Sequence, residues 1–164
     1  MIANKETVYT KDVANKKIKV VREFDAPVEK VWRAWTEKEL LDQWWAPKPW
    51  KAITQSMDFR NGGTWLYYMQ GPEGERHYCR ADYSSIVPNK SYEALDAFCD
   101  EKGNISTEMP RMNWKIVFNK AESGTKVNVE ITFASVEDLE KIIEMGFKEG
   151  FAMAHNNLDE LLAQ

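Results

Sequence analysis

Residues 24–50 read FDAPVEKVWRAWTEKELLDQWWAPKPW and contain five of the seven tryptophans of the chain. Asp25 is placed to cap the N-terminus of a helix, and Pro27 suits its first turn. Apolar residues then recur at helical spacing: Val28, Val31, Trp32 and Trp35. The stretch therefore predicts a short amphipathic helix whose aromatic face covers a core, a pocket mouth or a partner.

A second short helix follows directly. Thr36 and Glu39 have the spacing of a capping box, which restarts the chain as a helix. Its apolar residues are Leu40, Leu41, Trp44 and Trp45. Pro47 and Pro49 come next, and proline ends a helix. A strand that begins at residue 17 precedes both helices, because apolar and charged residues alternate there.

The residues after the helices alternate as β-strands, with turn-forming residues such as Asn61-Gly62-Gly63 between them. Strands are expected over 52–59, 64–70, 75–87, 91–99, 107–119 and 125–133. Such short connections favour an antiparallel meander. If Pro88-Asn89 is a hairpin tip, paired positions sum to 177. Cys79 and Cys99 would then lie near each other, as free, half-buried thiols.

The C-terminal segment predicts one long helix of about seven turns. Ser135 with Asp138 has the spacing of an N-cap. The apolar face runs through Leu139, Ile142, Ile143, Gly146, Phe147, Gly150, Phe151, Ala154, Leu158, Leu161 and Leu162. The fold class is therefore α+β: a curved antiparallel sheet of about six to seven strands wrapped on this helix. Residues 1–15 are expected to be a flexible arm, and 16–164 a single domain.

Composition narrows the class of function. The chain has 164 residues, 43% of them apolar and 29% charged, with a net charge of −4. Lysine and arginine are not concentrated on any one element, so nucleic-acid binding is not expected. The first residues lack the apolar core of a signal peptide, and no stretch reaches the roughly 18 apolar residues of a membrane span, so the cytoplasm is the expected compartment.

Small residues on the last helix raise the question of a cavity. Gly146, Gly150 and Ala154 lie four residues apart, and a glycine inside a helix costs roughly 1 kcal/mol relative to alanine. Either a strand approaches the helix closely there, or room is left for a ligand. The candidate lining residues are Trp35, Met57, Trp65, Tyr67, Met69, Tyr83, Met112, Trp114, Ile143, Gly146, Phe147, Gly150 and Phe151. The alternative for each of them is ordinary core.

Four segments resemble a known family: FDAPVEKVWRAWTEKELLDQWW, FRNGGTWLYYMQGPEGE, YSSIVP and GFKEGFAMAHNNLDELL. Over roughly residues 17–163 the chain resembles the activator of heat-shock-protein-90 ATPase homologue-like family of the START and Bet v 1 superfamily. The resemblance implies a helix-grip fold with an internal cavity for lipids or for polyketide- and flavonoid-like compounds. Ser85 stands where the family often has glutamate and Phe151 where it has tryptophan, so a less polar interior is expected.

Catalytic and metal-binding motifs are absent from the sequence. His77, Cys79 and Cys99 are three potential metal ligands, but their spacing matches no usual site, and no cofactor is expected. His155 is expected to be capped or half-exposed. Seven charged residues are candidates to reach the cavity: Asp58, Arg60, Arg80, Asp82, Glu93, Asp96 and Glu130. Several of them alternate with apolar neighbours, which is typical of the solvent face of a strand, and charged groups on strands are usually solvated.

Three functions are compatible with these residues. The first is binding of a small apolar molecule by a monomer or weak dimer. The second is a cyclase- or hydrolase-like enzyme, which needs a carboxylate, histidine or tyrosine of perturbed pKa in the cavity. The third is a protein-interaction module, for instance a chaperone partner, which requires that Trp44, Trp45 and Trp50 form an exposed apolar patch. Binding is preferred, because no residue in the sequence demands catalysis.

Overall fold

The computed structural model describes residues 6–164, which form eight strands and four helices. The strands are β1 (Val8–Asp12), β2 (Lys17–Phe24), β3 (Lys51–Met57), β4 (Thr64–Gln70), β5 (Arg76–Val87), β6 (Ser91–Cys99), β7 (Met112–Ala121) and β8 (Gly124–Thr132). The helices are α1 (Val28–Thr36), α2 (Lys38–Trp44), α3 (Val136–Glu144) and α4 (Phe147–Leu162). None of the described helices has the length and apolar character that crossing a bilayer requires.

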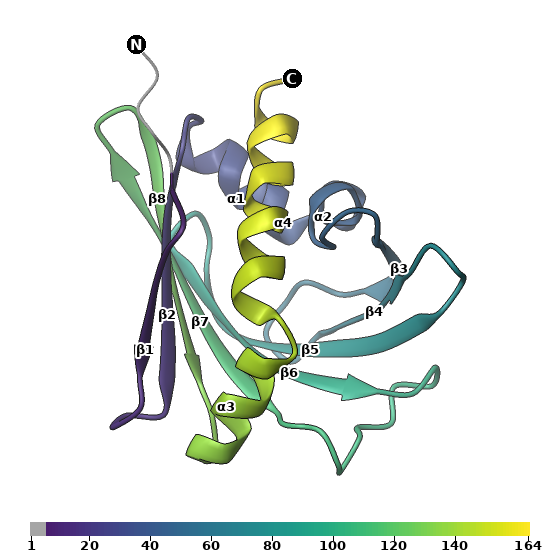
Figure 1. Cartoon of the computed structure of the whole chain (residues 1–164). Coiled ribbons are helices and arrows are strands. Elements are labelled where there is room, and N and C mark those ends of the chain that lie inside the picture. The colour runs from purple at the N-terminus through teal and green to yellow at the C-terminus, as the bar shows by residue number, and fades with distance from the viewer. Residues whose placement is uncertain (1–5) are drawn as a thin grey trace.

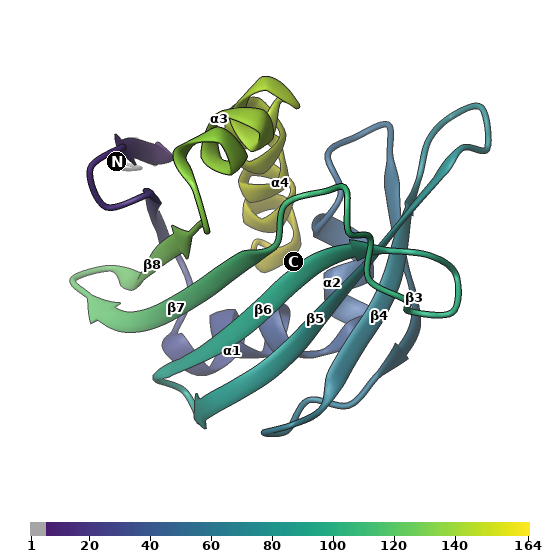
Figure 2. The same cartoon turned by 90° about the horizontal axis from the view of Figure 1, so that it is seen from below.

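The eight strands form one antiparallel sheet in the order β1-β2-β8-β7-β6-β5-β4-β3. The sheet bends around α4, and α1 and α2 lie beside α4 on the same side (Figure 1). Seen from below, β4 to β7 cross in front of α1 and α2, and α4 lies beside α3 (Figure 2). The predicted α+β helix-grip class is confirmed, with eight strands rather than six to seven.

The additional strand is β1, within the segment for which the sequence predicts a flexible arm. β1 pairs with β2 from Val8↔Val21 to Asp12↔Lys17, so this part of the expected arm lies at the edge of the sheet. The side chains of β1 are exposed or half-buried, and no apolar alternation marks it in the sequence. Residues 1–5 of the expected arm lie outside the described residues.

The C-terminal segment forms two helices, where apolar spacing predicts one. Gly146 separates α3 from α4 and has φ +90° and ψ 23°, in the left-handed region. A right-handed helix cannot continue through such a residue, and glycine adopts it without a steric penalty. The helical spacing of apolar residues resumes after the break, which explains why it is not visible in the periodicity.

Helix capping follows the sequence prediction at one helix of three. Ser135 precedes α3, and its hydroxyl accepts the backbone N–H of the third residue beyond it. The N-cap residues of α1 and α2 are Pro27 and Glu37, and neither makes a side-chain cap bond. The Thr36 hydroxyl instead donates to the Trp32 carbonyl oxygen (2.8 Å), so the predicted capping box does not form.

The β5–β6 hairpin has the predicted register and separates the two thiols. Cys79 pairs with Phe98, and Tyr78 pairs with Cys99. Neighbouring positions of a strand face opposite sides of the sheet. Cys79 is therefore buried on the concave face, while Cys99 is half-buried on the other face; both are free.

Candidate functional site

A cavity of about 220 Å³ lies between the concave face of the sheet and the junction of α3 with α4. Strands β4 to β7 form its floor. The segment that follows α2 forms one wall, and the helices form the other. Its lining residues are Trp45, Pro47, Tyr67, Met69, His77, Cys79, Asp96, Phe98, Met112, Trp114, Ile142, Met145, Gly146, Phe147, Gly150 and Phe151.

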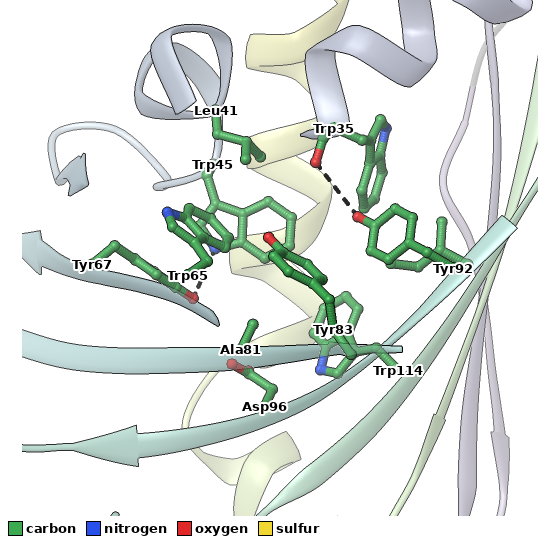
Figure 3. A pocket seen from close by; sticks show the side chains of 12 residues that line it. Trp35, Leu41, Trp45, Trp65, Tyr67, Ala81, Tyr83, Tyr92, Asp96 and Trp114 are labelled. Carbon is green, nitrogen blue, oxygen red and sulfur yellow. Dashed lines mark hydrogen bonds between the residues drawn. The ribbon is translucent and has the colours of Figure 1, made fainter. Parts of the chain in front are cut away.

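A smaller cavity of about 20 Å³ adjoins it deeper in the fold (Figure 3). The two share Trp45, Tyr67, Asp96 and Trp114 in their walls. A space of this size holds about one water molecule. The remaining wall of the smaller cavity consists of Trp35, Leu41, Trp65, Ala81, Tyr83, Tyr92, Ala94 and Ile116.

Strand alternation determines which side chains of β4 to β7 face the cavity. Cross-strand pairs on the concave face include Tyr67↔Cys79, Ala81↔Asp96 and Ala94↔Trp114. Side chains two residues apart share a face, so β6 presents Tyr92, Ala94, Asp96 and Phe98 to the interior. Ala81 and Ala94 are small and buried. They leave space above the sheet beside Asp96.

The candidate lining residues from the sequence fall into three groups. Those in the wall of the larger cavity are Tyr67, Met69, Met112, Trp114, Gly146, Phe147, Gly150 and Phe151. Trp35, Trp65 and Tyr83 line only the smaller cavity. Met57 and Ile143 line neither of the two and are half-buried against the hydrophobic core.

The glycines do not serve the close strand approach that was one of the two interpretations. A Cβ on Gly146 would meet nothing within 4 Å, and its positive φ ends a helix. A Cβ on Gly150 would lie 3.7 Å from Pro47 Cγ, in the segment after α2 and not in a strand. Both glycines line the larger cavity.

The segment after α2 is held against α4 by a buried amide. Asn157 is 7% exposed, and its side chain donates to the carbonyl oxygens of Trp44 (3.5 Å) and Ala46 (3.1 Å). These bonds fix the backbone on both sides of Trp45. The Trp45 ring then reaches the cavity and packs near Trp65, Trp114 and Phe151, with ring centroids 5.6, 5.7 and 6.1 Å away.

Trp44 and Trp45 therefore do not form the exposed patch considered for a protein partner. Trp44 is 1% exposed, and its indole nitrogen donates to the Ala34 carbonyl oxygen (2.8 Å). Trp50 is half-buried, with its ring centroid 5.1 Å from that of His77.

Three polar side chains in the wall are linked to one another. The indole nitrogen of Trp45 donates to the Tyr67 hydroxyl (3.0 Å), and that hydroxyl is hydrogen-bonded to the Cys79 thiol. Burial raises the pKa of both Tyr67 and Cys79 well above their usual values. Because the thiolate is the nucleophilic form, Cys79 is a protected thiol and not an activated nucleophile.

Two other polar atoms of the wall have no such partner. Asp96 Oδ1 and Trp114 Nε1 are buried and make no hydrogen bond with any described residue. Burial raises the pKa of the Asp96 carboxyl to about 7. Asp96 is one of the seven charged residues that the sequence offers as candidates to reach the cavity, the alternative for each being the solvent face. Alternation from the buried Tyr92 is the signal in the sequence that places it inside.

His155 lies in a second buried polar group and is not half-exposed as expected. Its side chain is 1% exposed, and Nδ1 lies 2.8 Å from the Thr7 hydroxyl. Arg22 donates to the same hydroxyl (2.8 Å) and forms an ion pair with Asp159. Burial, with a smaller effect of Arg22, lowers the pKa of His155 to about 3, so the imidazole is neutral at physiological pH.

The described residues contain no group of three or more histidine, cysteine or acidic side chains placed to hold a metal ion. His77 and Cys79 both line the cavity. Cys99 faces away from them, because it pairs with Tyr78 and not with Cys79. The three potential ligands considered from the sequence are thus not brought together.

A curved antiparallel sheet closed around a C-terminal helix, with a cavity between them, defines a helix-grip protein of the START and Bet v 1 superfamily. The chain belongs to the family of activator of Hsp90 ATPase homolog 1-like proteins, whose model matches residues 25–163. This confirms the resemblance found in the sequence. No curated protein matches the chain.

Several bacterial proteins of known structure are similar over nearly the whole chain. A Mycobacterium smegmatis protein has 30% identity and a TM-score of 0.89, with 96% of each chain covered. An Arthrobacter aurescens protein has 32% identity and a TM-score of 0.90, covering 95% of this chain and 91% of that one. A Nitrosomonas europaea protein has 30% identity and a TM-score of 0.81, covering 92% and 96%.

Proposed function

We propose that the chain binds one small, mostly apolar molecule in the 220 Å³ cavity. The observation that supports this most directly is the cavity itself, walled by aromatic and methionine side chains at the centre of a helix-grip fold. Protein interiors are otherwise close-packed, and voids this large are few. Aromatic faces and flexible thioethers suit flat apolar guests.

The volume restricts the size of that molecule. An apolar cavity of about 150 Å³ holds benzene, so 220 Å³ suits one ring or two fused rings. A long lipid chain or a complete flavonoid would have to extend through the opening. Met145 and His77 are exposed residues of the wall and mark that opening.

A matched pair of variants at Gly150 tests the proposal. Gly150→Leu places a large side chain in the cavity wall, whereas Gly150→Ala adds one methyl group in ordinary contact with Pro47. One- and two-ring aromatic compounds should raise the unfolding temperature of the wild type and of Gly150→Ala, but not of Gly150→Leu. Equal shifts in all three proteins, or none in the wild type, would contradict binding in this cavity.

Catalysis is a second candidate because of one residue. The enzyme hypothesis requires a carboxylate, histidine or tyrosine of perturbed pKa in the cavity, and Asp96 has that property. A general base with a pKa near the working pH is effective in proton transfer. Cys79, however, supplies no nucleophile beside it. Incubation of bound compounds with the wild type and Asp96→Asn, followed by mass spectrometry, would detect a product that depends on Asp96.

A further inference from the structure

Asp96 occupies a position at which its buried Oδ1 has no hydrogen-bond partner among the described residues. It pairs with Ala81 on β5 and Met112 on β7, and Ala94 precedes it on the same face of β6. The methyl groups of the two alanines cover little of the carboxyl. Figure 3 shows Asp96 beside Ala81 at the edge of the aromatic cluster. Asp96 belongs to the walls of both cavities and lies where they adjoin.

No cation of the wall neutralises this carboxyl group. The lining residues of both cavities include neither lysine nor arginine. The charges that influence Asp96 are Asp82 and Arg111, and these two form an ion pair with each other. Arg111 lies outside the wall of either cavity, as does Asp82, which faces the opposite side of the sheet. A buried carboxyl oxygen without a donor is costly, and a molecule in the cavity is the group that can reach it.

Trp114 adds a donor at the same place. Its β7 position pairs with Ala94, so its side chain is a diagonal neighbour of Asp96 on the concave face. Trp114 Nε1 is buried without a partner among the described residues. The cavity wall thus holds one buried acceptor and one buried donor that are neighbours and have no partner among the described residues.

We infer that the molecule bound in this cavity carries a hydrogen-bond donor, a hydroxyl or an ammonium group, which it places against Asp96. A hydroxyl oxygen can in addition accept from Trp114 Nε1. Carboxylate ligands such as fatty acids are disfavoured, because their charge would meet the ionised Asp96 in a wall that holds neither lysine nor arginine. This inference rests on the proposed binding function and specifies the chemistry of the ligand.

Four two-ring probes of the same skeleton test it: naphthalene, 2-naphthol, 2-naphthylmethylammonium and 2-naphthoate. Titration calorimetry at pH 8 would compare the full-length wild type with Asp96→Leu and Asp96→Asn. Glu93→Gln is the matched control, because Glu93 lies on the same strand but on the opposite face. Thermal unfolding would establish that each variant is folded.

The wild type and Glu93→Gln should bind 2-naphthol and the ammonium probe about tenfold more tightly than naphthalene, and 2-naphthoate at least tenfold more weakly. Asp96→Leu should retain naphthalene and lose the preference for both donors. Asp96→Asn should restore 2-naphthoate binding to the level of naphthalene, because the amide can donate. If Asp96→Leu does not fold, the binding of 2-naphthoate by Asp96→Asn decides the question.

The two hypotheses fail differently. If the probes bind the wild type and the Asp96 variants with the same order of affinity, the inference about Asp96 is overturned and binding in the cavity stands. If no probe binds the wild type or either variant, the proposed function is wrong, and the inference that rests on it falls as well.

Discussion

The two halves of the concave sheet face are filled differently. Under α1, the ring of Trp32 packs against Phe118, Tyr92 and Phe59, with centroids 5.1, 5.8 and 5.9 Å away. Under the junction of α3 and α4, the floor of the same sheet faces a cavity of about 220 Å³. The sheet is continuous across both halves. The covering helices differ: α1 contributes the ring of Trp32, whereas at the start of α4 two positions, Gly146 and Gly150, contribute no side chain beside the rings of Phe147 and Phe151.

His155 and Asp96 differ in what lies beside them. His155 Nδ1 lies 2.8 Å from the Thr7 hydroxyl, and the neighbouring Arg22 is paired with Asp159. His155 Nε2 is buried without a partner among the described residues, but it lines neither cavity. Asp96 Oδ1 also has no such partner, and Asp96 borders both cavities. A molecule in the cavity can therefore supply a partner to Asp96 but not to His155.

The largest expected effect contrasts the packing of the two halves. Trp32→Ala removes a ring enclosed by other rings and should destabilise the fold by about 3–5 kcal/mol. Met112→Ala removes a side chain that already borders a void, and it should cost about 1–2 kcal/mol, at or below the low end for such changes. Urea unfolding of both variants measures the difference. Equal losses would mean that the cavity half is as solidly packed as the other.

The second prediction concerns the pH dependence that His155 contributes. Its pKa is about 3 in the folded chain and about 6.5 in an unfolded one. The unfolded state therefore takes up the proton first, and stability is lost as the pH falls from about 6.5 towards 3. Between pH 7 and pH 4 this loss should be about 2–3 kcal/mol, and His155→Gln should lack it.

The measurement is the free energy of unfolding of both proteins at several pH values. Arg22 and Asp159, which lie in the same buried group, are present in both proteins, so their contributions cancel in the difference. Two parallel curves would show that His155 takes up its proton without unfolding and would contradict its burial as a neutral group.

Much of the fold could be predicted from the sequence. Alternation and turn residues placed the meander, and the Pro88-Asn89 tip gave the β5–β6 register. The break at Gly146 could not be read in the same way, because helical spacing continues from Ile143 to Phe147 across it. Its left-handed φ is a property of one residue, and periodicity averages over several. β1 is a strand because β2 offers it a partner, which is a tertiary effect.

The candidate site was harder to predict from the sequence, for a different reason. Aromatic and methionine residues such as Trp114 and Met112 could be named as candidates for the lining from their type, but alternation alone did not fix which strand face points inward. Asp96 was left open between the cavity and solvent, because charged residues on strands are usually solvated. The burial of Tyr92 on the same strand face, which the structure shows, places it inside. The rule fails here because Ala81 and Ala94 leave the carboxyl facing a cavity, and that depends on three strands together.

The third prediction is that Asp96 changes the stability with pH in the opposite direction to His155. The pKa of Asp96 is raised to about 7, against about 3.9 for an unfolded chain. The folded state holds the proton more tightly, so stability falls as the pH rises from about 4 to about 7. Asp96→Asn should therefore be about 2 kcal/mol more stable than the wild type at pH 8, with little gain at pH 4.

Other titratable groups lie near Asp96, and the experiment must show that they do not cause the pH dependence. Tyr67, Tyr83 and Cys79 hold their protons through this range, since burial raises each pKa, and His77 is exposed at the opening. Glu93→Gln removes a carboxylate from the outer face of the same strand and should leave the slope unchanged. A gain for Asp96→Asn that does not vary with pH would point to packing, not to a buried charge.

The smallest expected effect separates the two glycines that leave the cavity half hollow. Gly150→Ala should stabilise the chain by about 0.5–1 kcal/mol, because alanine favours the helix and its Cβ would lie 3.7 Å from Pro47 Cγ, an ordinary contact. Gly146→Ala should destabilise by about 1 kcal/mol, because φ there is +90°. Thermal unfolding of the two variants compares them directly. If both substitutions destabilise, Gly150 is held by a contact that tolerates no Cβ, and the space beside it is smaller than the cavity requires.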